Sequence, residues 1–213
     1  MKLLIFDVDG VLEKEEKLVE ARMETQMKLI SEKYDLSLEN AKKKFWDVKN
    51  SMSEDRKHTT AYVMEELGIS RADYFESLDN INPEGIIEPF ENVEEMLKSL
   101  SEYRLVVYSN SPVKACKRTL EAINVLKYFD RVYTAEDFNE SKPSLKNLKH
   151  ILNEEGFKVE DTYAVGNSPE KDTYPPMELG IKAILFDPAE KYSEKDGDYI
   201  IKDLIEIVEI VKS

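Results

Sequence analysis

Cysteine and histidine are scarce in this chain of 213 residues, which has a single cysteine, Cys116, and two histidines. One cysteine cannot form an internal disulfide, and the sequence has no CxxC pair and no Cys/His cluster, which excludes a disulfide scaffold and a structural zinc site. A chain of this length buries enough surface to fold without such cross-links. We therefore expect a reducing compartment and predict a cytoplasmic protein.

Basic residues are fewer than acidic ones, and the apolar runs are short. The 30 Lys and Arg residues face 44 Asp and Glu residues, a formal net charge of -14, which argues against nonspecific binding to nucleic-acid backbone, although a small anion could still bind locally. Apolar runs such as residues 3–6 fall far short of the roughly 18 residues that a membrane span needs. The first residues, MKLLIFDVDG, reach Asp7 after the apolar run, which is unlike a signal peptide. We expect neither a nucleic acid nor a membrane as partner.

Hydrophobic residues make up 41% of the chain, which is typical of a globular protein. Residues 3–6 form a short apolar run that ends in an acidic turn, as a buried strand of a parallel sheet does. From residue 14 to about residue 80, apolar residues recur at helical spacing between charged ones. We predict four helices there, with Gly68 at a C-terminal cap.

After Asn82, Pro83 and Gly85 mark a linker, and strands then alternate with helices. The expected strands are 105–108, 131–134, 162–165, 183–186 and 199–201, and the expected helices are 91–101, 113–122, 145–155, 170–179 and 204–211. This pattern predicts an α/β fold with a doubly wound, Rossmann-like parallel sheet. The core domain comprises residues 1–13 and 83–213, and an all-helical domain of residues 14–82 is inserted into it.

Polar side chains follow four of these expected segments, close to where a parallel sheet gathers its carboxyl ends in one crevice. They are Asp7, Asp9, Ser109, Asn110, Lys142, Asn167, Ser168 and Asp172. Each one alone has an ordinary structural explanation, because Asp and Gly are common in turns, Ser and Asn cap helices, and most lysines are solvated. Together they place carboxylates, a hydroxyl group and an ammonium group around one small volume.

Four segments carry these residues in order along the chain: IFDVDGVL, VVYSNSP, SKP and AVGNSPEKDTYPPMELGIKAI. Together they resemble the four motifs of the haloacid dehalogenase (HAD) superfamily of phosphotransferases, over residues 1 to about 187. The resemblance implies the HAD core fold. It also implies that the helical stretch of residues 14–82, which matches the family only in position, is a cap domain.

The chemistry of phosphate transfer requires these types of residue. A carboxylate that attacks phosphorus forms an aspartyl-phosphate and so splits the transfer into two easier steps, a role that fits Asp7. The resemblance assigns Asp9 as the acid that protonates the leaving oxygen and then as the base that activates water. Lys142 supplies fixed positive charge, and Ser109 and Asn110, with neighbouring amides, bind the phosphate oxygens. Mg²⁺ is the implied cofactor, held by the oxygens of Asp7, Asp9, Asn167 and Asp172.

Two features leave alternatives open. Asn167 stands where the family usually has Asp, so the site loses one charge and should hold the cation less tightly, and Asp172 ligates either directly or through water. In the helical segment, Arg56, Lys57 and His58 either reach the leaving group of the substrate or belong to a solvated charged surface.

The predicted function is that of a Mg²⁺-dependent phosphatase acting on a small phosphorylated metabolite, such as phosphoglycolate, a sugar phosphate or a nucleoside monophosphate. The alternatives are a phosphomutase, whose cap excludes water, and a catalytically weak sensor of phosphate or nucleotide, suggested by Asn167. Asp9 disfavours dehalogenation, because displacement of halide needs no protonated ester oxygen. We expect a monomer or a homodimer.

Overall fold

The computed structural model of the chain describes residues 1–213, except for the side chain of residue 55. The chain divides into two compact units, one of residues 1–15 and 87–213 and the other of residues 16–86. The expected boundaries, after residues 13 and 82, lie a few residues from these. Each unit is described by itself below.

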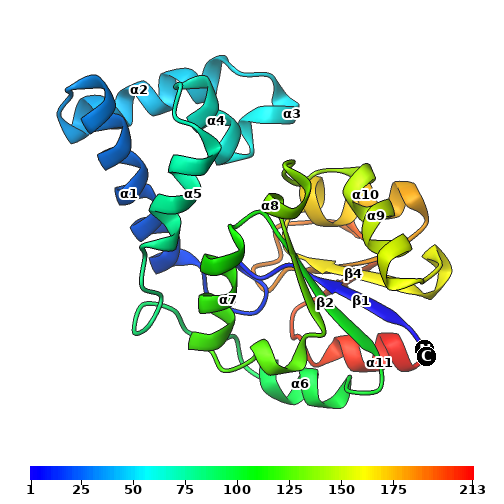
Figure 1. Ribbon diagram of the computed structural model, residues 1–213. Coiled ribbons are helices and arrows are strands. Elements are labelled where there is room, and N and C mark those ends of the chain that lie inside the picture. The colour runs from blue at the N-terminus through cyan, green and yellow to red at the C-terminus, as the bar shows by residue number, and fades with distance from the viewer. The chain divides into compact units, whose positions relative to one another are not determined.

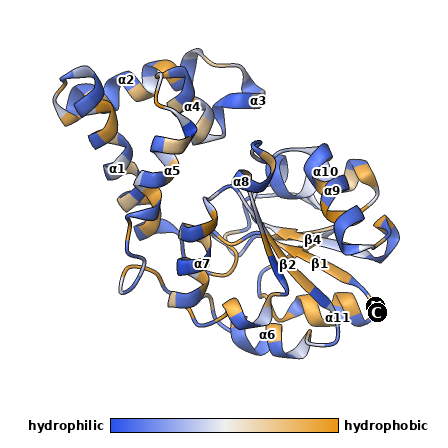
Figure 2. Cartoon of the chain, in the orientation of Figure 1, coloured by the Kyte–Doolittle hydropathy of each residue, from blue (hydrophilic) through white to orange (hydrophobic). Residues whose placement is uncertain are grey.

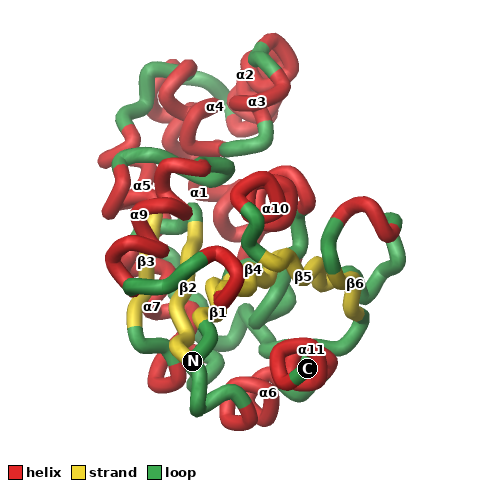
Figure 3. The backbone as a smooth tube through the Cα atoms, turned by 90° about the vertical axis from the view of Figure 1, so that its right-hand side faces the viewer, coloured by secondary structure: helices red, strands yellow, loops and turns green.

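The first unit is built on a parallel sheet (Figure 1), whose strand order β3-β2-β1-β4-β5-β6 can be followed in Figure 3. The strands are β1 (Leu3–Phe6), β2 (Arg104–Ser109), β3 (Arg131–Thr134), β4 (Thr162–Gly166), β5 (Lys182–Phe186) and β6 (Tyr199–Ile201). β1 lies inside the sheet, where Ile5 pairs with Val106 on one side and with Ala164 on the other. All of β1 is buried, as its continuously apolar sequence predicts for a strand covered on both faces.

The order of the strands places a topological switch point between β1 and β4. From β1 the chain adds β2 and β3 in one direction, through α6 (Val93–Ser99) and α7 (Val113–Ala122), and later adds β4, β5 and β6 in the other. Because crossovers are right-handed, α9 (Leu145–Glu155) and α10 (Tyr174–Leu179) cover the face opposite to α6. In such sheets, ligands bind outside the carboxyl ends of the strands at the switch point. The doubly wound core predicted from the sequence is confirmed.

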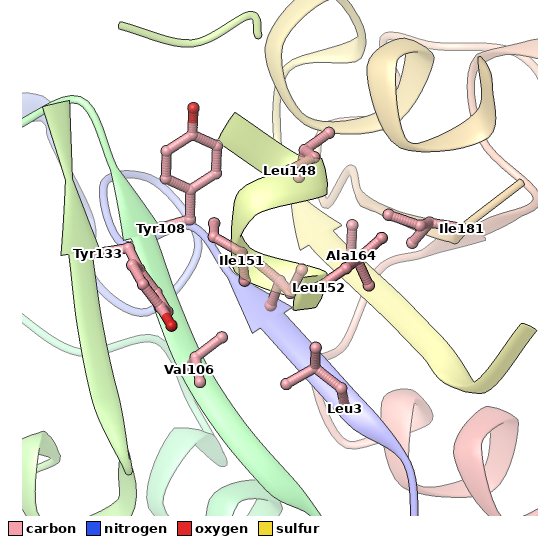
Figure 4. Close-up of a cluster of buried hydrophobic side chains, with 10 residues drawn as sticks. Leu3, Val106, Tyr108, Tyr133, Leu148, Ile151, Leu152, Ala164 and Ile181 are labelled. Carbon is pink, nitrogen blue, oxygen red and sulfur yellow. The ribbon is translucent and has the colours of Figure 1, made fainter. Parts of the chain in front are cut away.

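The core lies between the sheet and these helices. Leu148, Ile151 and Leu152 of α9 pack on strand residues that include Leu3 and Val106 (Figure 4). The strands are also the most continuously apolar part of this unit (Figure 2). The two remaining α-helices are α8 (Ala135–Phe138) and α11 (Glu206–Lys212), and α11 packs on α6. Truncating a side chain in such a core lowers the free energy of unfolding by about 2–5 kcal/mol. This packing therefore stabilises the strands whose ends carry the site residues.

The second unit is helical over its described residues: α1 (Glu16–Tyr34), α2 (Leu38–Ser51), α3 (Glu54–Lys57), α4 (Thr60–Glu66) and α5 (Arg71–Asp79). Ser37 caps α2, and Gly68 adopts φ +65° just after α4, as its predicted place at a C-terminus requires. The prediction of four helices was wrong in one place. The third expected helix is divided into α3 and α4, because Thr59 has extended backbone and starts a new helix.

The segment after β4 also differs from the expected single helix of residues 170–179. It begins as a π-helical turn, Pro169–Thr173, and only then becomes α10. Pro175 and Pro176 have no N–H to donate, so a regular α-helical ladder cannot run through this region. Nowhere in the described residues is a helix both long enough and apolar enough to cross a membrane.

Candidate active site

The centre of the candidate site is a buried ammonium group between two carboxylates. The Lys142 Nζ lies 2.9 Å from Asp7 Oδ1 and 2.7 Å from Asp172 Oδ1. Lys142 and Asp172 are only 4% and 5% exposed. Asp7 directly follows β1 and donates its N–H to the Val165 carbonyl of β4 at 2.9 Å, so it extends the pairing of these two strands by one residue. The three charged groups therefore meet at the switch point of the sheet.

Lys142 is held along its whole length. The Asn110 side chain pairs with both backbone groups of Lys142: its Oδ1 accepts from the Lys142 N–H at 2.5 Å, and its Nδ2 donates to the Lys142 carbonyl at 3.1 Å. The Lys142 Nζ also lies 5.3 Å from the centre of the Tyr108 ring, a distance typical of a cation–π contact. With its amide used in this way, Asn110 joins two loops, and any contact with phosphate falls to its backbone.

Tyr108 and Asn147 were not among the residues predicted from the sequence. The Asn147 Nδ2 donates to the Tyr108 hydroxyl at 2.9 Å, which fixes the ring beside Lys142, and burial raises the pKa of Tyr108. The sequence contained one indication, since Tyr108 directly precedes Ser109 at the end of a strand. Asn147 lies within α9, and no pattern in the sequence marks it.

Asp172 is placed by the π-helical turn. Its Oδ2 accepts the Ser168 N–H at 3.1 Å while its Oδ1 accepts from Lys142. The turn also brings Asp172 against the end of β4, because a Cβ atom on Gly166 would lie 2.0 Å from the Asp172 Cβ. Only glycine at position 166 allows this approach.

The surroundings of Asp7 disfavour its ionised form. Burial raises the pKa of Asp7 to about 7; Lys142 opposes the rise, whereas Asp172 and Asp9 add to it. Burial by itself would lower the pKa of Lys142, but the facing Asp172 and Asp7 carboxylates raise it, so Lys142 is the charged partner. One lysine therefore does not neutralise the acidic groups around it.

Asp9 and Ser109 are linked through a third residue, Ser111. The Ser111 Oγ donates to Asp9 Oδ2 at 3.2 Å, and the Ser111 N–H donates to Ser109 Oγ at 3.1 Å. Ser109, at the end of β2, is 1% exposed. Ser111 was also missed in the sequence, although it lies two residues after Ser109.

The chain also matches a known protein family over most of its length. The sequence model of the haloacid dehalogenase-like hydrolase family matches residues 4–186. The chain belongs to this family.

Individual relatives carry phosphatase and hydrolase names. A glyceraldehyde 3-phosphate phosphatase of Methanocaldococcus jannaschii is 31% identical over 134 residues, which cover 60% of this chain and 58% of the relative. The chain spans about three fifths of the length of the curated relatives it matches. Among solved structures, a HAD phosphatase from Thermococcus onnurineus has a TM-score of 0.78 at 23% identity and covers 99% of this chain and 98% of its own. A HAD-hydrolase from Bacillus subtilis bound to magnesium has a TM-score of 0.67 at 17% identity, with coverage of 100% and 99%.

The oxygen-bearing residues at the site have the chemistry that binds a magnesium ion. Among the described residues, no three His, Cys, Asp or Glu side chains form a ready-made metal cage. The available oxygens belong to Asp7, Asp9 and Asn167, and the Asn167 side chain lies close to Gly10, where its Nδ2 would be 2.0 Å from an added Cβ. Few protein oxygens and several retained waters are what Mg²⁺ prefers. Burial is the main cause of the raised pKa of Asp7, and a divalent cation would offset the acidic charge of Asp172 and Asp9 that adds to it.

The three basic residues that were predicted to contact substrate lie beside glutamates of the second unit. Arg56 Nη1 lies 3.1 Å from Glu66 Oε1. Lys57 Nζ and His58 Nε2 lie 2.5 Å and 3.5 Å from the two carboxylate oxygens of Glu54. These exposed pairs account for the three side chains as a solvated charged surface, and a contact with substrate stays a prediction.

Proposed function

We propose that this protein is a phosphatase that hydrolyses a small phosphomonoester through an aspartyl-phosphate on Asp7. The observation that carries the proposal is the ion pair of Asp7 with the buried Lys142, whose head group is held by Asp172. Such a lysine keeps a fixed positive charge beside the attacking carboxylate, where a phosphate dianion must approach. Membership of the hydrolase family and the phosphatase names among its relatives support the proposal.

In the first step, an oxygen of Asp7 attacks phosphorus and the bond from phosphorus to the leaving oxygen breaks. Asp9, in its acid form, gives its proton to that oxygen, so that an alcohol leaves. In the second step, the Asp9 carboxylate takes a proton from water, the water oxygen attacks phosphorus, and the bond to Asp7 breaks. Phosphate is released, and Asp7 is again a carboxylate.

The remaining residues bind and orient the phosphoryl group. Lys142, the Ser109 hydroxyl and neighbouring backbone amides donate to the oxygens on which charge is spread in the transition state. Asp172 acts as the anchor of Lys142, since both of its oxygens already accept hydrogen bonds. We propose that Asp7 and Asn167 hold Mg²⁺ through their side chains and Asp9 through its backbone oxygen, which leaves the Asp9 carboxyl group for proton transfer; the ion, when bound, would neutralise charge on the phosphoryl group.

The test is hydrolysis of 4-nitrophenyl phosphate by the purified protein, with Mg²⁺ or with a chelator. We expect Mg²⁺-dependent turnover that Asp7→Asn abolishes. A matched control is Asp187→Asn, because Asp187 is also a buried aspartate directly after a strand, but it accepts the Tyr192 N–H at 2.8 Å and has no part in the proposed reaction. Activity that persists in Asp7→Asn would overturn the assignment.

The other two functions give different results in the same assay. A phosphomutase would require a sugar bisphosphate for activation and would return the phosphoryl group to a bound sugar. A sensor would bind phosphate esters without turnover, and Asn167→Asp would then be the variant expected to gain activity.

A further inference from the structure

Ser111 is a buried polar residue beside the site that the proposed reaction does not use. It lies in the loop between β2 and α7 and is 6% exposed. Its two donors point to two different groups: the Oγ donates to Asp9 at 3.2 Å, and the N–H donates to Ser109 at 3.1 Å. One residue thus contacts both the proposed acid and the proposed phosphate ligand.

The loop that carries Ser111 is fixed on both sides. On one side, Asn110 pairs with both backbone groups of Lys142. On the other side, the Val113 N–H at the start of α7 donates to the Glu136 carboxylate at 2.6 Å. Because its neighbours are held in this way, Ser111 can keep a constant orientation while substrate binds and leaves.

We infer that Ser111 is a positioning residue that orients the Asp9 carboxyl group for proton transfer to the leaving oxygen. The inference rests on the proposed function and adds a residue to it. A hydrogen bond donated to Oδ2 favours the acid form that carries its proton on Oδ1, so the Ser111 hydroxyl selects which oxygen delivers the proton. In the same way, the Ser109 Oγ accepts the Ser111 N–H and directs its own proton elsewhere, to a phosphate oxygen.

The dependence of the rate on the leaving group distinguishes this role from a merely structural one. A poor leaving group, such as an alkoxide, needs a well-placed acid, whereas 4-nitrophenolate leaves without much help. The constant kcat/KM reports the steps up to the departure of the leaving group. We therefore expect Ser111→Ala to lower kcat/KM for alkyl phosphates by about 10²-fold and for 4-nitrophenyl phosphate by only a few-fold, since general acids contribute 10²–10⁴-fold.

The experiment measures kcat/KM for a series of aryl and alkyl phosphates with the full chain and saturating Mg²⁺. Ser111→Thr keeps the hydroxyl and should restore the dependence on the leaving group. Ser144→Ala is the matched control, because Ser144 is similarly buried but caps α9 through the Asn147 N–H. We expect that control to lower Tm without changing the dependence on the leaving group.

Each outcome of this experiment either supports or refutes the proposed role of Ser111. If Ser111→Ala lowers kcat/KM by the same factor for every leaving group, or if it has no effect, the positioning role is refuted. If the wild-type protein hydrolyses none of the substrates, the proposed function itself fails and the inference falls with it. A steeper dependence in Ser111→Ala, reversed in Ser111→Thr, supports the inference.

Discussion

Gly166 allows Asp172 to approach the end of β4 very closely, so Gly166→Ala is a direct test of how the site is assembled. The added Cβ would lie 2.0 Å from the Asp172 Cβ, 2.4 Å from its Cγ and 2.6 Å from its Oδ2. Carbon atoms in contact are normally about 3.5–4.0 Å apart. Asp172 would therefore have to retreat by more than about 1 Å, a movement that its 2.7 Å contact with Lys142 cannot survive unchanged.

The expected loss of folding stability has two parts. Overpacking costs about 1–3 kcal/mol, and a weakened hydrogen bond between charged groups costs about 1.5–3 kcal/mol. We therefore expect the free energy of unfolding to fall by about 2.5–6 kcal/mol. A displacement of about 1 Å at a reacting group can reduce the rate by about 10²-fold, and we expect a loss of that size in kcat/KM.

Phosphatase assays measure the loss in kcat/KM, and urea unfolding measures the loss of stability. Gly156→Ala is the control: Gly156 has φ +71° and nothing within 4 Å of its Cβ position. That variant should lose roughly 1 kcal/mol to backbone strain and keep full activity. Wild-type stability in Gly166→Ala would refute the steric argument, and wild-type kcat/KM in a destabilised Gly166→Ala would refute the role of Asp172 in holding Lys142.

Three further predictions concern the metal, the pH dependence and the helical unit. Asn167→Asp adds a carboxylate and should lower the Mg²⁺ concentration for half-maximal activity roughly tenfold; a titration that shows no change would count against Asn167 as a ligand. Although burial opposes it, the hydrogen bond from Arg104 lowers the pKa of Glu155 below its usual 4.5. The stability that this bond contributes is present above that value and is lost as the pH falls through the lowered pKa, so Tm should fall less with acid in Glu155→Gln than in the wild type. Ile30 of α1 is fully buried, so Ile30→Ala should cost about 2–4 kcal/mol in the helical unit, measured by the fluorescence of Trp46, the single tryptophan; an unchanged midpoint would contradict this role of Ile30 in the packing.

Much of the fold could be predicted because its signals are local. The apolar run of residues 3–6 and the later strands are short and continuous, as strands buried on both faces must be. The motif residues could be placed near one another from the same pattern, since parallel strands gather their carboxyl ends. The division at Thr59 and the π-helical turn at Pro169–Thr173 could not be predicted, because both depend on backbone angles that several residue types can adopt.

The sequence alone determined which residues form the sheet and which types of group lie at its edge, because hydrophobic periodicity and turn residues act over a few positions. Only the tertiary structure decided which groups face one another. It placed Lys142 between Asp7 and Asp172, used Asn110 to hold the Lys142 backbone, and brought Ser111 to Asp9. These contacts join segments far apart along the chain, and their distances depend on how the whole sheet closes around its core.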